Sequence, residues 1–184
     1  VALFDGDTGT PDELLRHADL AMYRAKTNGR NRLSFFDPGM QAALVERGAR
    51  ESALRQAIGR DELRLAFQPQ VDDHGRALAV EALLRWTDAE QRNVAPVEFI
   101  AIAEESGLID AIGAWVLDHA CQQLELWARQ ALTRRLQVAV NISSRQFLDA
   151  RFVPQVRAAL ERAGADPRKL KIELTEGAVL RDIP

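Results

Sequence analysis

The order of strand-like and helix-like segments after residue 61 is the feature that most limits how this chain can fold. Residues 63–71 and 77–86 have the composition of strands, and only the turn residues Asp72-Asp73-His74-Gly75 separate them. So short a connection permits only an antiparallel pair. The elements predicted after this hairpin are a helix over 96–106 closed by Gly107, a helix over 110–130, a strand over 136–141, a helix ending at Gly164 and a strand over 169–175.

Strands that alternate with helices indicate a parallel sheet with right-handed crossovers, and therefore an α/β fold. Four strands are visible from residue 61 onward. A doubly wound sheet and half of a β/α barrel both fit this order of elements, and the alternation does not choose between them.

The part of the chain before residue 61 predicts two helices. Thr10 is suited to cap the first one and Glu13 completes a capping box, while Asn28-Gly29 is suited to end it. Residues 32–36 then predict a short strand. Residues 40–58 predict a mostly polar helix, and a helix joining two domains is the simplest account of it.

The composition of the chain excludes several classes of protein. Hydrophobic residues make up 47% of the 184 residues, which is enough for a folded core. The 27 acidic and 24 basic side chains give a net charge of −3, so we expect no binding to DNA or RNA. Charges interrupt every apolar run before the ~18 residues that a membrane span needs, so we expect no membrane contact from this segment.

Two further features indicate the cellular setting. Cys121 is the one cysteine, which suits a reducing compartment. The chain opens on Val1 rather than methionine and shows no signal peptide. We therefore expect a cytoplasmic piece of a longer protein, whose upstream segments can carry a membrane tether.

Three polar residues occupy strand positions where apolar ones are expected. Glu81, Asn141 and Glu173 each lie in a different predicted strand. One interpretation is that each is simply a surface position, because alternation exposes every second residue of a strand. Three such residues on successive strands favour a shared site instead, since ligands of α/β folds gather at the carboxyl ends of parallel strands.

The chemistry of these three side chains indicates a hard divalent cation. Two carboxylates and an amide carbonyl suit Mg²⁺ or Mn²⁺ rather than Zn²⁺. The histidines predict no rival site, because His119 and Cys121 point to different faces of one helix and His17 and His74 are expected in solvent.

A set of motifs in a fixed order carries a family resemblance. The central motif is Val80-Glu81-Ala82-Leu83-Leu84-Arg85-Trp86. The others are Phe67-Gln68-Pro69-Gln70, Pro96-Val97-Glu98-Phe99-Ile100, Ala103-Glu104-Glu105-Ser106-Gly107-Leu108-Ile109, Val140-Asn141-Ile142-Ser143 and Glu173-Leu174-Thr175-Glu176. In order and spacing, residues 61–184 resemble the first half of an EAL domain, the family of cyclic-di-GMP phosphodiesterases.

The resemblance implies a fold and a set of roles. The fold is a TIM-like (β/α)8 barrel whose first strand is antiparallel to its neighbours, with about four strands present here. Glu81, Asn141 and Glu173 are implied as metal ligands, and Gln68 and Arg85 as contacts to the dinucleotide. Glu176 is implied to hold a later loop, although Gly177 follows it where the family more often has serine.

The implied reaction is hydrolysis of cyclic di-GMP to linear pGpG by a water molecule that two divalent ions activate. Glu81 and Glu173 bring only two negative charges, too few to hold two such ions. The family supplies an Asp-Asp pair, a Lys and a further Glu, which are expected beyond Pro184. We therefore expect this chain to be inactive by itself and its parent protein to be the enzyme.

The first segment resembles a different family. The run Ala18-Asp19-Leu20-Ala21-Met22-Tyr23-Arg24-Ala25-Lys26, followed by Gly29-Arg30-Asn31, is similar to the end of a GGDEF (diguanylate cyclase) domain. Lys26 and Arg30 are implied as phosphate contacts. On this interpretation residues 1–37 are a GGDEF remnant, 38–60 a linker helix and 61–184 the truncated EAL domain.

Two alternatives to hydrolysis stay open. One is a catalytically silent receptor that binds cyclic di-GMP and signals to a partner, and the other is an interaction module that mainly dimerises. Silent members often lose ligands in their signature, whereas Glu81, Asn141 and Glu173 are all present. The expected partners are cyclic di-GMP and, through the EAL domain, a second copy of the protein.

Overall fold

The computed structural model describes residues 1–3, 10–27 and 31–174. The chain divides into two compact units, residues 1–50 and 51–184, and the boundary falls within helix α2 (Gly39–Ala57). No helix among the described residues is both long enough and apolar enough to cross a membrane.

The first unit begins with helix α1 (Pro11–Thr27), and its N-terminus has the predicted capping box. The backbone N–H of Thr10 donates to Glu13 Oε2 at 2.8 Å, and the backbone N–H of Glu13 donates to Thr10 Oγ1 at 3.3 Å. The Thr10 N–H holds the pKa of Glu13 below its usual value. The predicted end of the helix at Asn28-Gly29 lies outside the described residues. Within the described part of this unit, the His17 ring stacks on the Phe36 ring, with ring centroids 3.7 Å apart.

The predicted strand over 32–36 is absent from the described structure. This segment exchanges two hydrogen bonds with Val1, whose amino group donates to the Ser34 carbonyl at 2.6 Å and whose carbonyl accepts from Phe36 N–H at 2.9 Å. A strand needs a partner strand whose backbone N–H and C=O groups pair with its own over several residues. The single residue Val1 is too short a partner to form such a ladder.

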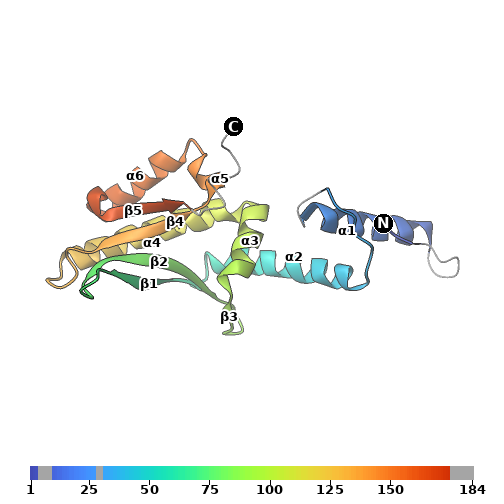
Figure 1. The fold of residues 1–184 in the computed structure, drawn as a ribbon, viewed down its shortest axis with the longest axis horizontal. Helices are drawn as coiled ribbons and strands as arrows, with labels where there is room; N and C mark the ends of the chain where they lie inside the picture. The colour runs from blue at the N-terminus through green and yellow to red at the C-terminus, as the bar shows by residue number, and fades with distance from the viewer. Residues whose placement is uncertain (4–9, 28–30, 175–184) are drawn as a thin grey trace. The chain divides into compact units, whose positions relative to one another are not determined.

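The second unit is built on one sheet with the strand order β1-β2-β4-β5 (Figure 1). The strands are β1 (Leu63–Val71), β2 (Ala77–Thr87), β4 (Gln137–Ile142) and β5 (Leu170–Leu174). The predicted hairpin is confirmed, since β1 and β2 are antiparallel around Gly75, and the remaining neighbours are parallel. The pairing of β1 with β2 is regular except for a register shift between Gln70 and Val71. A two-residue strand that was not predicted, β3 (Asn93–Val94), pairs with β2.

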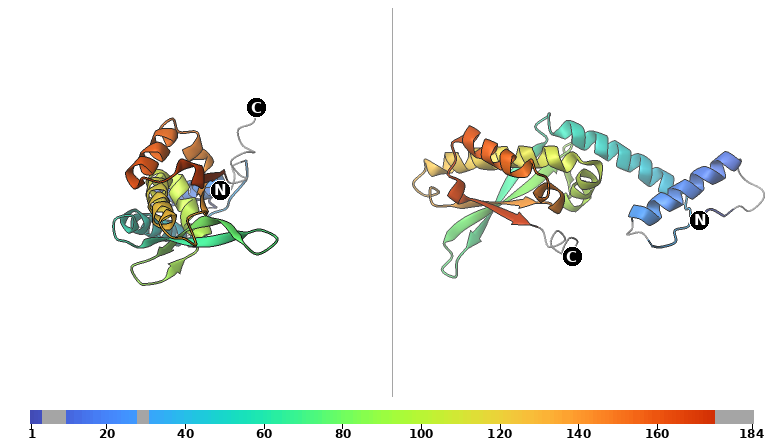
Figure 2. Two further views of the ribbon diagram at one scale, coloured as in Figure 1. Left: turned by 90° about the vertical axis from the view of Figure 1, so that its left-hand side faces the viewer. Right: turned by 90° about the horizontal axis from the view of Figure 1, so that it is seen from above.

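Helices cover one face of this sheet (Figure 2). They are α3 (Pro96–Ser106), α4 (Leu108–Ala128) and α6 (Phe152–Ala163), with the single turn α5 (Ser144–Phe147) and the 3-10 turn η1 (Pro167–Lys169) in the connections. Gly107 separates α3 from α4 with a φ of 79°, which glycine adopts without strain. The chain can therefore turn there directly from one helix into the next.

The core lies between these helices and every second residue of the strands. Val80 and Ala82 of β2 and Val138 and Val140 of β4 are buried against Phe99 and other helix residues. We call this the core face. Because strand side chains alternate, the intervening residues point to the opposite face. We call that the site face, and it carries Gln68, Glu81, Asn141 and Glu173.

Candidate functional site

Glu81 is the polar residue at the middle of β2, and its neighbours Val80 and Ala82 are both in the core. It is half-buried on the site face. In register, it lies opposite Gln68 of β1 on one side and Ala139 of β4 on the other. Ala139 is small and fully buried.

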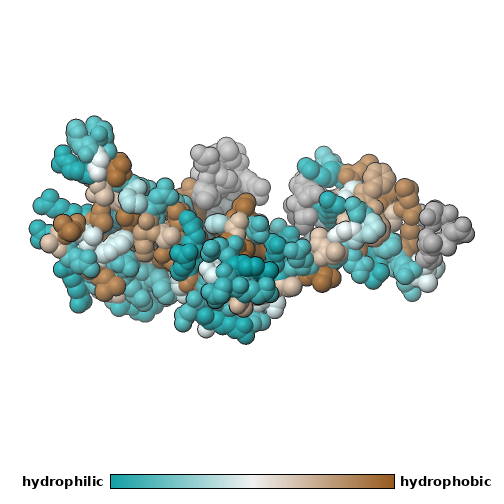
Figure 3. Space-filling view, turned by 90° about the horizontal axis from the view of Figure 1, so that it is seen from below, coloured by the Kyte–Doolittle hydropathy of each residue, from teal (hydrophilic) through white to brown (hydrophobic). Residues whose placement is uncertain are grey.

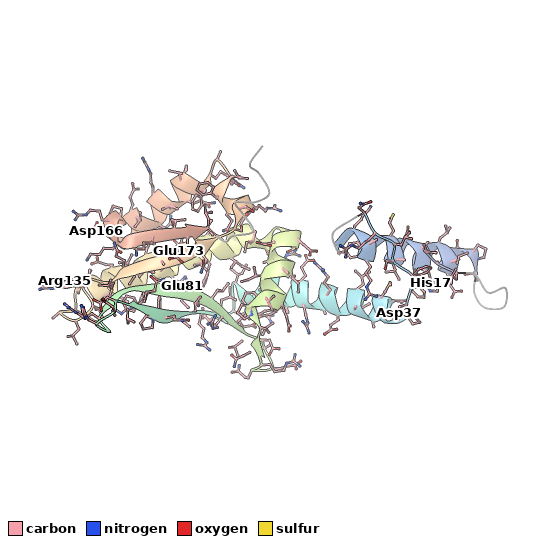
Figure 4. The ribbon with its side chains drawn as sticks, viewed as in Figure 1. His17, Asp37, Glu81, Arg135, Asp166 and Glu173 are labelled. Carbon is pink, nitrogen blue, oxygen red and sulfur yellow. The ribbon has the colours of Figure 1, made fainter. Side chains whose placement is uncertain are left out.

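Asn141 is the residue that links the strands of the site. Its Nδ2 donates to Glu81 Oε1 at 2.6 Å, joining residues 60 positions apart in the sequence. It also lies in register opposite Glu173 of β5. Figure 4 shows Glu81 and Glu173 on the strands either side of β4. The fold therefore gathers Glu81, Asn141 and Glu173 on adjacent strands of one sheet face.

Arg85 lies on the same face as Glu81, four residues nearer the end of β2. It is half-buried, and its guanidinium donates to the Leu84 carbonyl at 2.9 Å. Directly opposite in register is Arg64 of β1. Two like charges opposite each other on a sheet are destabilising unless an anion lies near them. Arg64 was not predicted, and the signal that identifies it is the hairpin register, which pairs residues 64 and 85 once the turn is placed.

The donor atoms of the site fit the chemistry of a hard cation. Glu81 and Glu173 supply carboxylate oxygens and Asn141 an amide oxygen, the donor types that Mg²⁺ and Mn²⁺ prefer. The Asn141–Glu81 bond uses Nδ2 and Oε1, so the other oxygens of both groups stay available as donors to a metal. Within the described part of the chain, no three His, Cys, Asp or Glu side chains are grouped so that they could hold a metal ion.

The single thiol is placed in the core. Cys121 is fully buried on α4, and this burial raises the pKa of its thiol to about 11. At neutral pH the group is therefore a protonated, weakly reactive thiol. His119, two residues earlier, stacks on Trp115 and has Nδ1 2.8 Å from the Trp115 carbonyl oxygen.

Three further residues were predicted to have functional roles: Lys26, Arg30 and Glu176. Lys26 belongs to the first unit, where it is exposed on α1 and lines a shallow hollow with Asn31 and Arg32. Arg30 and Glu176 lie outside the described residues. The roles of all the named site residues stay predictions.

The fold and the site define a class. A parallel α/β sheet with an antiparallel first strand, covered by helices on one face and carrying carboxylates and an amide on the other, is an α/β protein of the TIM-like type. Residues 51–183 match the model of the EAL domain family. The chain therefore belongs to the EAL domain family.

Curated relatives match almost the whole chain. It is 43% identical over 183 residues to the bifunctional diguanylate cyclase/cyclic di-GMP phosphodiesterase MucR of Pseudomonas aeruginosa, covering 99% of this chain and 27% of MucR. It is 35% identical over 169 residues to the cyclic di-GMP phosphodiesterase PdeR of Escherichia coli, covering 92% and 25%. The chain thus spans about a quarter of the length of these relatives.

Solved structures show the same fold. The PaMucR phosphodiesterase in complex with c-di-GMP superposes with a TM-score of 0.69 at 41% identity, covering 73% of this chain and 54% of that one. The EAL domain of Xanthomonas citri FimX in complex with c-di-GMP gives a TM-score of 0.65 at 26% identity, covering 76% and 53%.

Proposed function

We propose that this chain carries the first metal-binding and nucleotide-binding residues of a cyclic-di-GMP phosphodiesterase, which hydrolyses cyclic di-GMP to linear pGpG. The observation that carries the proposal is the 2.6 Å bond from Asn141 to Glu81, with Glu173 in register beside Asn141. Relatives named as cyclic di-GMP phosphodiesterases support it.

The residues of the site face have distinct proposed roles. Glu81, Asn141 and Glu173 would hold Mg²⁺ or Mn²⁺. When bound, the ions lower the pKa of a water molecule and offset the charge on the attacked phosphate. Gln68 would contact the dinucleotide. Arg85, whose planar guanidinium matches phosphate oxygens, would hold a phosphate, and the opposing Arg64 adds to the positive charge there.

Two ions need more negative charge than two carboxylates provide, so further acids of the whole protein would complete the site. We propose that Glu176 holds a later loop rather than a metal. The chain by itself would be inactive, and the whole protein would be a homodimer through its EAL domain.

The first unit fits the end of a GGDEF domain, with Lys26 and Arg30 as former phosphate contacts and residues 38–60 as the linker. Exposed large hydrophobic side chains of this unit support its being part of a larger domain that covers them (Figure 3). They include Leu3, Leu15, Met22, Leu33, Phe35 and Val45.

The test is hydrolysis of cyclic di-GMP by the full-length protein with Mg²⁺ or Mn²⁺, with pGpG followed by chromatography. Glu81→Ala should abolish turnover because it removes a ligand to the metal. Glu90→Ala is the matched control, because Glu90 is an exposed carboxylate just beyond β2 that pairs with Arg92. A wild-type protein that binds cyclic di-GMP without turnover in either metal would be a silent receptor, which contradicts the proposal.

A further inference from the structure

Ser143 and Gln146 are the buried polar side chains of the described structure, each only 8% exposed. Ser143 is two residues after Asn141, between the end of β4 and the single turn α5, and Gln146 lies within α5. Such a short helix is marginal in isolation. The stability of α5 alone therefore does not explain why a glutamine is buried in this turn, and the explanation lies in what the Gln146 side chain contacts.

The two side chains form a closed set of hydrogen bonds. Gln146 Oε1 accepts from the Ser143 backbone N–H at 3.2 Å and from Ser143 Oγ at 3.0 Å. The Gln146 backbone N–H in turn donates to Ser143 Oγ at 3.3 Å, which completes a capping box. Ser143 is thereby held in place two residues beyond Asn141.

Gln146 also joins this turn to the long helix α4. Its Nε2 donates to the Ile109 carbonyl at 3.1 Å, in the first turn of α4. We call the bonds among Ser143, Gln146 and Ile109 the Gln146 clamp. The clamp fixes the segment that follows Asn141 to the helix that packs on β4.

Because Gly113 has no side chain, it leaves the space that the Gln146 amide occupies. It is buried in α4, one turn after Ile109, and a Cβ atom there would collide with Gln146 Nε2. Glycine within a helix is unfavourable relative to alanine, so a buried glycine at this position has to be explained by its surroundings. The Gln146 amide lies against the Cα of Gly113, and this close approach explains why the position is a glycine.

We propose that Gln146 is a positioning residue for the metal site: through Ser143, the clamp holds Asn141 where its amide meets Glu81. Gln146 itself would touch neither metal nor nucleotide. The inference rests on the proposed function, because it takes Asn141 as a metal ligand. Residues that orient metal ligands from behind typically change metal affinity by 10–100-fold when they are substituted.

The test is Mn²⁺ binding to the full-length protein, measured by titration with electron paramagnetic resonance of the free ion. Gly113→Ala is the most informative variant, because it displaces only the end of the Gln146 side chain and keeps every donor and acceptor of the clamp. Gly113→Ala and Gln146→Ala should each weaken Mn²⁺ binding by about 10-fold. Ser143→Ala is a milder change that keeps the Gln146–Ile109 bond and should weaken binding less.

Leu124→Ala is the structural control. Leu124 is buried near the other end of α4, so this variant destabilises the same helix without touching the clamp, and its Mn²⁺ affinity should equal that of the wild type. In the Gln146→Ala background, Gly113→Ala should cause no further loss, because the group with which it collides is gone.

The outcomes separate the two proposals. Wild-type Mn²⁺ affinity in both Gly113→Ala and Gln146→Ala overturns the positioning role, whether or not the protein hydrolyses cyclic di-GMP. A wild-type protein that binds Mn²⁺ but does not hydrolyse the nucleotide overturns only the proposed function. If the wild type binds no Mn²⁺, both fail.

Discussion

The two faces of the β2–β4–β5 sheet use alternate residues of the same strands for different purposes. On the core face, the buried strand residues include Val80, Ala82, Val140 and Ile142, which pack under the helices. On the site face, Glu81 and Asn141 lie between those residues in the sequence and bond to each other across the sheet. The same strands therefore contribute buried apolar side chains to the core face and polar side chains to the site face. Substitutions one position apart in a strand should therefore have separable effects on stability and on ligand binding.

The largest expected effect is on the core face. Phe99 of α3 is fully buried and meets Trp86 edge-on, with ring centroids 5.7 Å apart. Phe99→Ala removes that packing and leaves a cavity, so the free energy of unfolding should fall by about 3–5 kcal/mol. Urea denaturation of the full-length protein measures this. A loss below about 1 kcal/mol, in a protein that unfolds in one transition, would contradict this account of the core.

A smaller effect is expected on the site face. Arg85→Ala should weaken cyclic di-GMP binding by roughly 10- to 100-fold, since charge-assisted hydrogen bonds contribute about 1.5–3 kcal/mol. It should leave Mn²⁺ affinity and unfolding nearly unchanged. Calorimetry with the nucleotide and with Mn²⁺ separates the two affinities. Arg76→Ala, an exposed arginine at the hairpin turn, controls for the loss of one positive charge. Equal nucleotide affinity in Arg85→Ala and wild type would remove Arg85 from the site.

The smallest expected effect concerns pH and the core face. Burial raises the pKa of Cys121 from 9.0 to about 11, so the unfolded thiol ionises first as the pH rises. Its contribution to stability is therefore complete below pH 9 and is lost between about pH 9 and pH 11. Stability curves of wild type and Cys121→Ala should differ by a constant below pH 9 and converge above it. A constant difference up to pH 11 would show that the thiol pKa is not raised.

Local sequence signals predicted most of the fold correctly. The hairpin was predictable because its four-residue turn is local, and the parallel strands were predictable because the crossover helices are long and periodic. The two-residue β3 was missed because so short a run has no periodicity. The strand over 32–36 was wrong because pairing depends on a partner that local composition does not reveal.

The residues of the site were also easier to predict from the sequence than the hydrogen bonds between them. Glu81, Asn141 and Glu173 were identifiable as polar residues within apolar strands, but the Asn141–Glu81 bond depends on the register of β2 against β4. The clamp did have a local signal, because Ser143 and Gln146 have the spacing of a capping box. Its bond to Ile109, 37 residues away, depends on how α4 packs and has no local signature.

The register shift between Gln70 and Val71 has a consequence for how this hairpin can vary in length. The irregularity lies beyond the Gln68–Glu81 pair, on the side of the turn. If a residue is inserted or deleted around Gly75, the pairing can adjust at this irregularity near the turn. The Gln68–Glu81 pair and the orientation of Glu81 then stay unchanged. The same insertion on the other side of Glu81, between it and Arg85, would turn Arg85 toward the helices, because side chains alternate with a period of two. Length variation among such domains should therefore concentrate at the turn and be rare within the strand.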